Sequence, residues 1–151
     1  DETGGSLHDR LAELAPAVLA ETLDQLAAGT APRVPQDAAA SSYISKLERD
    51  DGRLDWSQDA AALERRIRAY DPWPGTFTLA TEDGRAKRLK IFPPVTVLDE
   101  HLSPGEISTA GSRLVVGCGT GALCLEIVQP DGSRKMSAAD YLRGRKPTAF
   151  A

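Results

Sequence analysis

The chain has 151 residues and a formal net charge of −4 at pH 7, and 41% of its residues are hydrophobic. This length suits one domain with an appendage, and this composition suits a core of ordinary size. No apolar run approaches the ~20 residues that span a bilayer, which excludes a spanning helix in this sequence. No signal-peptide pattern occurs either. Because Asp1 is not a methionine, we expect the chain to be part of a longer protein.

The charge is unevenly distributed along the sequence. Residues 1–56 carry a net charge of −6, whereas residues 85–151 carry a net charge of +4. A basic C-terminal half is compatible with a polyanionic partner. A solvated surface of uneven charge explains the asymmetry at least as well.

Residues 1–29 are predicted to be helical. Ser6 is the expected N-cap, with Asp9 three residues later as in a capping box. Pro16 is expected to break this helix or to begin a second one. Gly29 is a plausible C′ residue that ends the helical region. Apolar residues recur at helical spacing through this stretch: Leu7, Leu11, Leu14, Val18, Leu19, Leu23 and Leu26.

Residues 30–40 contain two prolines and are predicted to be an extended linker. A second helix is expected from Ser57, as N-cap, to Tyr70, and Asp59 places negative charge at the positive end of the helix dipole. Its apolar stripe comprises Ala60, Leu63, Ile67 and Tyr70, while Arg65 and Arg68 lie on the opposite face.

Two prolines flank Trp73 and hold its backbone stiffly. An indole that is fixed in this way can be aimed into a neighbouring core. We therefore predict that Trp73 is a buried residue between the second helix and the rest of the fold.

The remainder of the sequence is dominated by short strands. Glycine-containing turns separate them, Pro93-Pro94 interrupts one of them, and Ser137 caps a last helix over residues 138–142. Such spacing is typical of a small, partly closed barrel. The predicted fold is α+β and mainly β, an OB-like β-barrel over residues 41–147 with one packed helix, preceded by the helical arm and linker and followed by a tail, 148–151. The expected strands cover residues 76–81, 85–92, 95–98, 105–109, 113–117 and 122–128.

One motif suggests a different kind of enzyme. Residues 114–121 run from a strand into a G-x-G-x-G pattern, as in the nucleotide loop of a methyltransferase. That chemistry needs a helix directly afterwards, but residues 122–128 favour a strand, so a hairpin turn is the better interpretation.

His8 and His101 have no partners at metal-ligand spacing. Cys118 and Cys124 are expected to be small buried residues of a reduced cytosolic protein.

Several segments together resemble methionyl-tRNA formyltransferases. Residues 6–14 are similar to the end of the catalytic domain of that family, and residues 63–70, 104–107 and 135–142 are similar to its C-terminal domain. Two further segments resemble the same C-terminal domain: Leu54-Asp55-Trp56-Ser57 and Asp71-Pro72-Trp73-Pro74-Gly75. The tryptophan–proline segment alone also occurs in other formyl-transfer proteins, such as formyltetrahydrofolate dehydrogenases.

The resemblance implies a division of labour within a longer parent protein. Residues 1–29 would be the last helices of its N-terminal catalytic domain, and the barrel would help to bind initiator methionyl-tRNA. The parent would transfer a formyl group from 10-formyltetrahydrofolate to the methionyl amino group. The catalytic Asn, His and Asp of the family lie upstream, and His8 does not match the catalytic histidine. The chain alone is therefore expected to be inactive, with no catalytic, cofactor-binding or metal site of its own.

Five cations are predicted to contact tRNA phosphates. They come from the linker, the second helix and one strand: Arg33, Arg65, Arg68, Arg88 and Lys90. Arg88 and Lys90 are expected to point away from Leu89 and Ile91, because side chains alternate across a strand. If the helix packs its apolar stripe onto the barrel, the four cations of the helix and the strand are expected to stay in solvent. The chain is expected to act as a cytoplasmic monomer. Two alternatives remain open, which are a formyltransferase or dehydrogenase module without tRNA binding and an enzyme built on the glycine motif.

Overall fold

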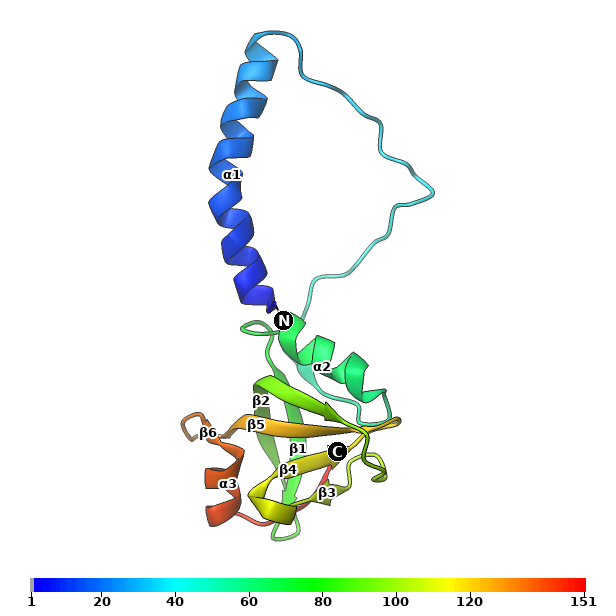
Figure 1. Ribbon diagram of the computed structural model, residues 1–151, viewed down its shortest axis with the longest axis vertical. Coiled ribbons are helices and arrows are strands. Elements are labelled where there is room, and N and C mark those ends of the chain that lie inside the picture. Colours follow the sequence, from blue (N-terminus) through cyan, green and yellow to red (C-terminus); the bar gives the residue numbers. More distant parts are fainter. Residues whose placement is uncertain (1) are drawn as a thin grey trace.

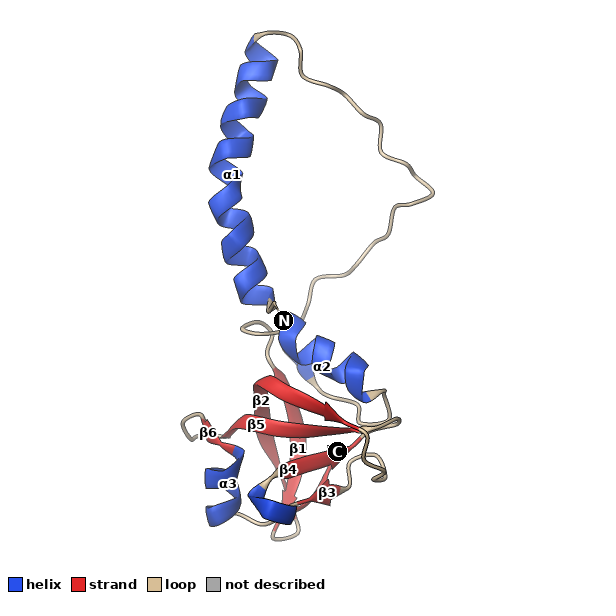
Figure 2. Ribbon diagram, in the orientation of Figure 1, coloured by secondary structure: helices blue, strands red, loops and turns tan. Residues whose placement is uncertain are grey.

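The computed structural model describes residues 2–151 as a small, mainly β body from which one long helix projects (Figure 1). Figure 2 shows the strands gathered in that body, with one helix across one end and another at its side. In chain order, the elements are α1 (Gly4–Ala27), η1 (Arg49–Gly52), α2 (Ala60–Ala69), β1 (Thr76–Glu82), β2 (Arg85–Leu98), β3 (Ile107–Ser108), η2 (Ala110–Ser112), β4 (Leu114–Gly117), β5 (Ala122–Pro130), β6 (Met136–Ser137), α3 (Ala138–Gly144) and β7 (Pro147–Phe150).

The strands form a nearly closed antiparallel sheet, which confirms the predicted small OB-like barrel. Their order is β3-β4-β5-β2-β1-β7, and β6 pairs with β5. The Phe150 N–H donates to the Gly105 carbonyl at 2.9 Å, which ties β7 to the segment that leads into β3. A sheet closed in this way leaves few free edges.

The barrel interior is filled by alternate residues of the strands and by one face of α2. Leu89 and Ile91 of β2 are each 1% exposed, as the period of two predicts. Ala60, Leu63 and Ile67 of α2 are buried in the same core cluster, which confirms three members of the predicted apolar stripe. The fourth, Tyr70, is the C-cap of α2 and is only partly buried. The α2 helix therefore lies across the barrel with its opposite face turned outward.

The predicted N-cap of α2 was two residues early. Asp59 is the N-cap, because its side chain accepts a hydrogen bond from the Ala62 N–H at 3.1 Å. The Ser57 hydroxyl instead donates to Asp55 at 2.7 Å, within a turn that precedes the helix. Asx turns and N-caps use the same short polar side chains, so sequence alone does not separate them.

The prediction that Trp73 is buried was wrong, because it is 56% exposed. The core indole is that of Trp56, which is 4% exposed and donates to the Thr78 hydroxyl at 2.9 Å. Its ring lies 5.9 Å from the ring of Phe150. Trp56 is drawn into the core because residues 53–54 run beside β1, with the Leu54 N–H donating to the Phe77 carbonyl.

Pro16 does not break the N-terminal helix, contrary to expectation. The α1 helix is continuous, and its N-cap is Thr3, which forms a capping box with Ser6 rather than Ser6 with Asp9. No residue of α1 is buried, so the carbonyl that Pro16 leaves without a donor can be hydrated. Gly29 follows the helix with a φ of 69°, as predicted for a C′ glycine.

The N-terminal end of α1 contacts the C-terminal end of α2 directly. The Gly5 N–H donates to the Asp71 carbonyl at 2.8 Å, and Arg68 donates to the Glu2 carbonyl at 2.8 Å. A Cβ atom at Gly4 would lie only 2.3 Å from the Ala69 carbonyl oxygen. This glycine therefore permits a helix–helix approach that any other residue would block.

Two features of the sheet were not predicted. The end of the chain, expected to be a tail, contains β7, which pairs with β1. The strand interrupted at Pro93-Pro94 is one strand, β2, with a register shift between Phe92 and Val95 where it pairs with β5. Proline has no N–H to donate, and the irregular register leaves Pro93 and Pro94 out of the ladder with β5, which is how a strand accommodates prolines.

The glycine motif forms the turn between β4 and β5. No helix follows Gly121, since β5 begins at Ala122, so the methyltransferase alternative lacks the element that its chemistry needs. The turn lies against the start of α2, where the Gly119 N–H donates to the Gln58 carbonyl at 2.9 Å.

Gly119→Ala should destabilise the fold by about 1–3 kcal/mol, the range for overpacking. The added Cβ would lie 1.9 Å from the Ser57 carbonyl oxygen, which is backbone and has little freedom to move. Urea unfolding of this variant should be compared with that of Gly144→Ala, because Gly144 has no heavy atom within 4 Å of its ideal Cβ position. Equal stability of the two variants would contradict this account of the turn.

Candidate nucleic-acid interface

The outward face of β2 presents cations beside the buried leucine and isoleucine. Strand alternation turns Arg88 and Lys90 away from Leu89 and Ile91, as predicted. Lys90 is exposed and pairs in the ladder with Phe77 and Gln129. Residues 88 and 90 are two apart in the strand, so their Cα atoms lie roughly 6.5 Å from each other.

Arg88 is less free than expected. Its guanidinium carbon lies 3.6 Å from the ring centroid of Phe77, which is 6% exposed. Its Nε atom is buried and has no hydrogen-bond partner within residues 2–151. Cation–π contact of this kind fixes the guanidinium in one place. Arg88 is therefore a positioned cation and not a flexible one in solvent.

A second cation–aromatic contact extends the same face and was missed in the sequence analysis. Lys135 places its Nζ atom 3.6 Å from the ring centroid of Phe92, the next outward residue of β2. Lys135 belongs to the turn between β5 and β6, and the pairing of β2 with β5 brings this turn to β2. The Arg134-Lys135 pair just after a turn signal was the available clue. We call Arg88, Lys90 and Lys135 the β2 basic face.

The two predicted arginines of α2 differ in their surroundings. Arg65 is exposed, and no ion pair engages it within residues 2–151. Arg68 is ion-paired with Glu64, and this contact holds the pKa of Arg68 above its ordinary value. Because Arg68 also donates to the Glu2 carbonyl, much of its hydrogen-bonding capacity is used within the fold. The expectation that Arg68 would stay free in solvent is therefore corrected.

The fifth predicted cation, Arg33, is exposed on the linker, which runs well away from the barrel (Figure 1). The structure thus brings two predicted residues together, Arg88 and Lys90. It leaves Arg65 on the outward face of α2 and Arg33 apart from both.

A buried carboxylate lies at the end of β1, beside the start of β2. Glu82 is 4% exposed and accepts hydrogen bonds from Tyr141 at 2.6 Å, Arg145 at 2.9 Å and Lys87 at 3.1 Å. Burial alone would raise the pKa of Glu82, but these three hydrogen bonds outweigh it and hold the pKa below the ordinary value. The same burial and the Glu82 acceptor raise the pKa of Tyr141, so its hydroxyl stays protonated.

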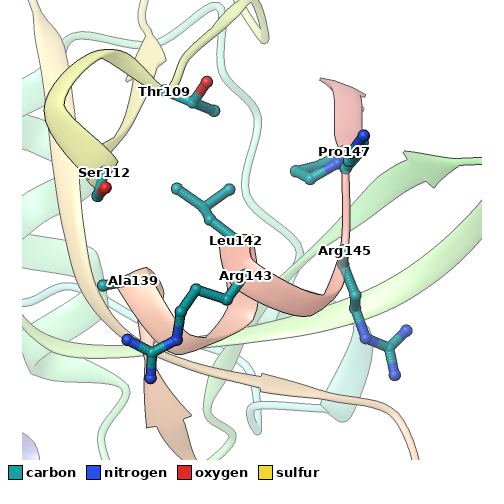
Figure 3. A pocket seen from close by; sticks show the side chains of 8 residues that line it. Thr109, Ser112, Ala139, Leu142, Arg143, Arg145 and Pro147 are labelled. Atoms are coloured by element: carbon teal, nitrogen blue, oxygen red, sulfur yellow. The ribbon is translucent and has the colours of Figure 1, made fainter.

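A recess of about 430 Å³ lies between η2, α3 and β7. Figure 3 shows Leu142 pointing into it, with Thr109 and Ser112 on one side and Pro147 on the other. The side chains of Arg143 and Arg145 extend away from Leu142 in this view. Acids, histidines and thiols are absent from the described residues that line it, so it offers no acid–base or nucleophilic constellation.

The other reactive side chains show no assembled site. His8 is exposed beside Asp9, and within residues 2–151 no group of three His, Cys, Asp or Glu side chains could hold a metal ion. Both cysteines are free, and burial raises the pKa of Cys118 to about 11, so this thiol is a poor nucleophile. Helices long and apolar enough to cross a membrane are also lacking in the described part of the chain.

The fold and its outward cations define a class of protein, a small OB-like barrel with a basic strand face. Residues 46–146 match the profile of the family described as "Formyl transferase, C-terminal domain". The chain belongs to this family.

Two curated relatives of this chain are methionyl-tRNA formyltransferases. The chain is 42% identical over 146 residues to a methionyl-tRNA formyltransferase of Akkermansia muciniphila, which covers 95% of this chain and 46% of the relative. It is 41% identical over 145 residues to that of Geobacter metallireducens, again over 95% of this chain and 45% of the relative. The chain therefore spans less than half the length of these relatives.

Solved structures share the fold. HypX from Aquifex aeolicus superposes with a TM-score of 0.62 at 23% identity, covering 93% of this chain and 26% of that chain. A second HypX structure, in complex with tetrahydrofolic acid, gives a TM-score of 0.57 at 23% identity, over 82% of this chain and 22% of that chain.

Proposed function

We propose that this chain is the C-terminal part of a methionyl-tRNA formyltransferase and that its barrel helps to bind initiator methionyl-tRNA. The β2 basic face is the observation that carries this proposal. The curated relatives, at about 42% identity over nearly the whole chain, support it. The parent enzyme would transfer the formyl group of 10-formyltetrahydrofolate to the methionyl amino group in translation initiation.

The contacts of the β2 basic face would be made to phosphates. Contacts to phosphates carry no sequence information, so they would position the tRNA and not specify it. Arg88 and Lys135 each rest on an aromatic ring, so less side-chain freedom would be lost on binding. Arg65, on α2, and Arg33, in the linker, are proposed as further phosphate contacts, whereas Arg68 would contribute mainly long-range charge.

We propose the same domain division that the sequence indicates. Residues 1–29 would form the last helices of the catalytic domain, and residues 30–40 would link that domain to the barrel. The exposed apolar residues of α1 would contact the rest of the catalytic domain. The folate co-substrate would bind there and not to the barrel. With tRNA as its substrate, the parent is expected to act in the cytoplasm, as a monomer.

Removing two cations of the β2 basic face should weaken tRNA binding and flatten its salt dependence. For Lys90→Ala/Lys135→Ala we expect the log–log slope of affinity against salt to fall by roughly 0.7 to 0.9 for each phosphate that the variant no longer neutralises. Filter binding or fluorescence anisotropy with initiator tRNA over a salt series would measure both quantities.

The matched control is Lys46→Ala/Arg49→Ala, which removes the same charge from exposed residues that are not proposed as contacts. Equal reductions in affinity in the two double variants would show that net charge, and not this face, governs binding. A larger reduction in the control would transfer the phosphate contact to the segment that precedes α2.

A competing function is that of a C-terminal module without tRNA binding in another formyltetrahydrofolate-dependent protein. The fold shared with HypX favours keeping this alternative. It predicts that neither double variant alters tRNA affinity, because the wild-type chain would show no saturable binding.

A further inference from the structure

We propose that Lys87, Arg145 and Lys146 form a phosphate-binding site where α3 joins β7, here called the Arg145 site. This site adjoins the β2 basic face, because Arg88 borders one of the same recesses, but it consists of different cations. The proposal stands whether or not that face binds tRNA.

The position of Arg145 among the surface recesses is the first observation. Arg145 lines the recess of Figure 3 and two others, of about 420 and 270 Å³. Lys146 borders the first two of these recesses, and Lys87 borders the last two. All three cations therefore border one recess, that of about 420 Å³.

Glu82 holds two of these cations at a fixed separation. Arg145 Nη1 and Lys87 Nζ donate to the same Glu82 oxygen, Oε2, at 2.9 and 3.1 Å. The two nitrogens therefore lie within 6 Å of each other. An anion with several oxygens can bridge donors at this separation, because N–H···O⁻ distances are about 2.7–2.9 Å.

Most of the donors of these cations remain unused. Arginine carries five N–H donors and lysine three, and each contributes one to Glu82. The side chains of Arg145 and Lys87 are 34% and 42% exposed, whereas that of Glu82 is 6% exposed. The carboxylate is thus covered, whereas both cations are partly open to solvent.

The local charge favours an anion over a neutral ligand. The recess of about 420 Å³ is bordered by four cations, Lys87, Arg143, Arg145 and Lys146, and by two acids, Glu82 and Asp83. Arg143 is engaged by Asp140, but Lys146 is exposed and has no ion pair within residues 2–151. A planar arginine fork beside lysine point charges is suited to phosphate, whose oxygens accept from several directions.

Titration of the chain with inorganic phosphate, followed by two-dimensional NMR against chloride at equal ionic strength, tests the site. We expect saturable amide shifts centred on residues 87, 145 and 146. Lys146→Ala and Arg145→Lys should each weaken phosphate binding by about tenfold, the effect of losing one hydrogen bond to a charged group. Arg49→Ala, which removes an exposed and distant cation, should bind phosphate as the wild type does.

Shifts that equal those caused by chloride, or wild-type phosphate affinity in both variants, would overturn the proposal. Lys146 is exposed, so its variant remains informative even if Arg145→Lys is destabilised. Melting curves would be recorded for both.

Two competitors identify the source of the phosphate group. Displacement of inorganic phosphate by tRNA would assign the site to an RNA phosphodiester. Displacement by adenosine monophosphate but not by tRNA would assign it to a small phosphomonoester. Failure of the β2 basic face to bind tRNA would leave the inorganic phosphate shifts unchanged, so the two proposals fail separately.

Discussion

Replacing Trp56 with alanine should lower the free energy of unfolding by about 3–5 kcal/mol, the range for deleting a large buried aromatic side chain. The indole is 4% exposed, contacts the Phe150 ring and donates to Thr78. Its removal would leave a cavity where residues 53–56, β1 and β7 meet. Urea unfolding monitored by circular dichroism would measure the change.

Trp73→Ala provides the matched control, since it deletes the same side chain from a site that is 56% exposed. We expect a change within about 0.5 kcal/mol, as for most surface substitutions. If the two tryptophan variants unfold at the same urea concentration, the assignment of Trp56 to the core is incorrect.

Glu82→Ala should also be strongly destabilising, by about 3 kcal/mol. The substitution leaves the buried Tyr141 hydroxyl without its acceptor and removes the common partner of Lys87 and Arg145. Tyr141→Phe is the informative comparison, because it deletes one hydrogen bond but keeps the carboxylate and both cations. It should cost about 1 kcal/mol, and a destabilisation equal to that of Glu82→Ala would assign the whole effect to the tyrosine.

The same carboxylate should make stability fall in acid. The pKa of Glu82 lies below its ordinary value of 4.5, so the unfolded chain binds its proton more readily than the folded chain. Its contribution is therefore complete above pH 4.5 and is lost as the pH falls through the lowered pKa. Glu82→Gln has no carboxylate to protonate, so its stability should decline less over that range of pH.

Local patterns predicted most of the barrel. Period-two alternation located Leu89 and Ile91 in the core, and helical spacing located Leu63 and Ile67. The predictions that failed depend on contacts between residues that are far apart in the sequence. Nothing near Trp56 or Trp73 in the sequence says which indole meets Phe150, because that contact depends on where β7 closes the sheet.

The candidate interface was predicted in part for the same reason. Arg88 and Lys90 follow from the alternation of one strand, so they were found. Lys135 reaches this face only through the pairing of β2 with β5, which is a distant contact. The engagement of Arg68 by Glu64 is different, because an i,i+4 pair within one helix can be read from the sequence. Charge in a sequence identifies cations, but their availability depends on neighbours that the fold supplies.

The contact between Gly5 and Asp71 changes what the intervening linker has to do. Since α1 touches α2 directly, the linker closes a loop between two points that are already joined and does not set their separation. The entropy of such a loop grows only with the logarithm of its length, by roughly 0.6 kcal/mol for each doubling. Insertions or deletions in this segment should therefore be tolerated during evolution without reorienting α1 against the barrel. A side chain at Gly4, in contrast, should disturb that orientation directly, because it would collide with the Ala69 carbonyl.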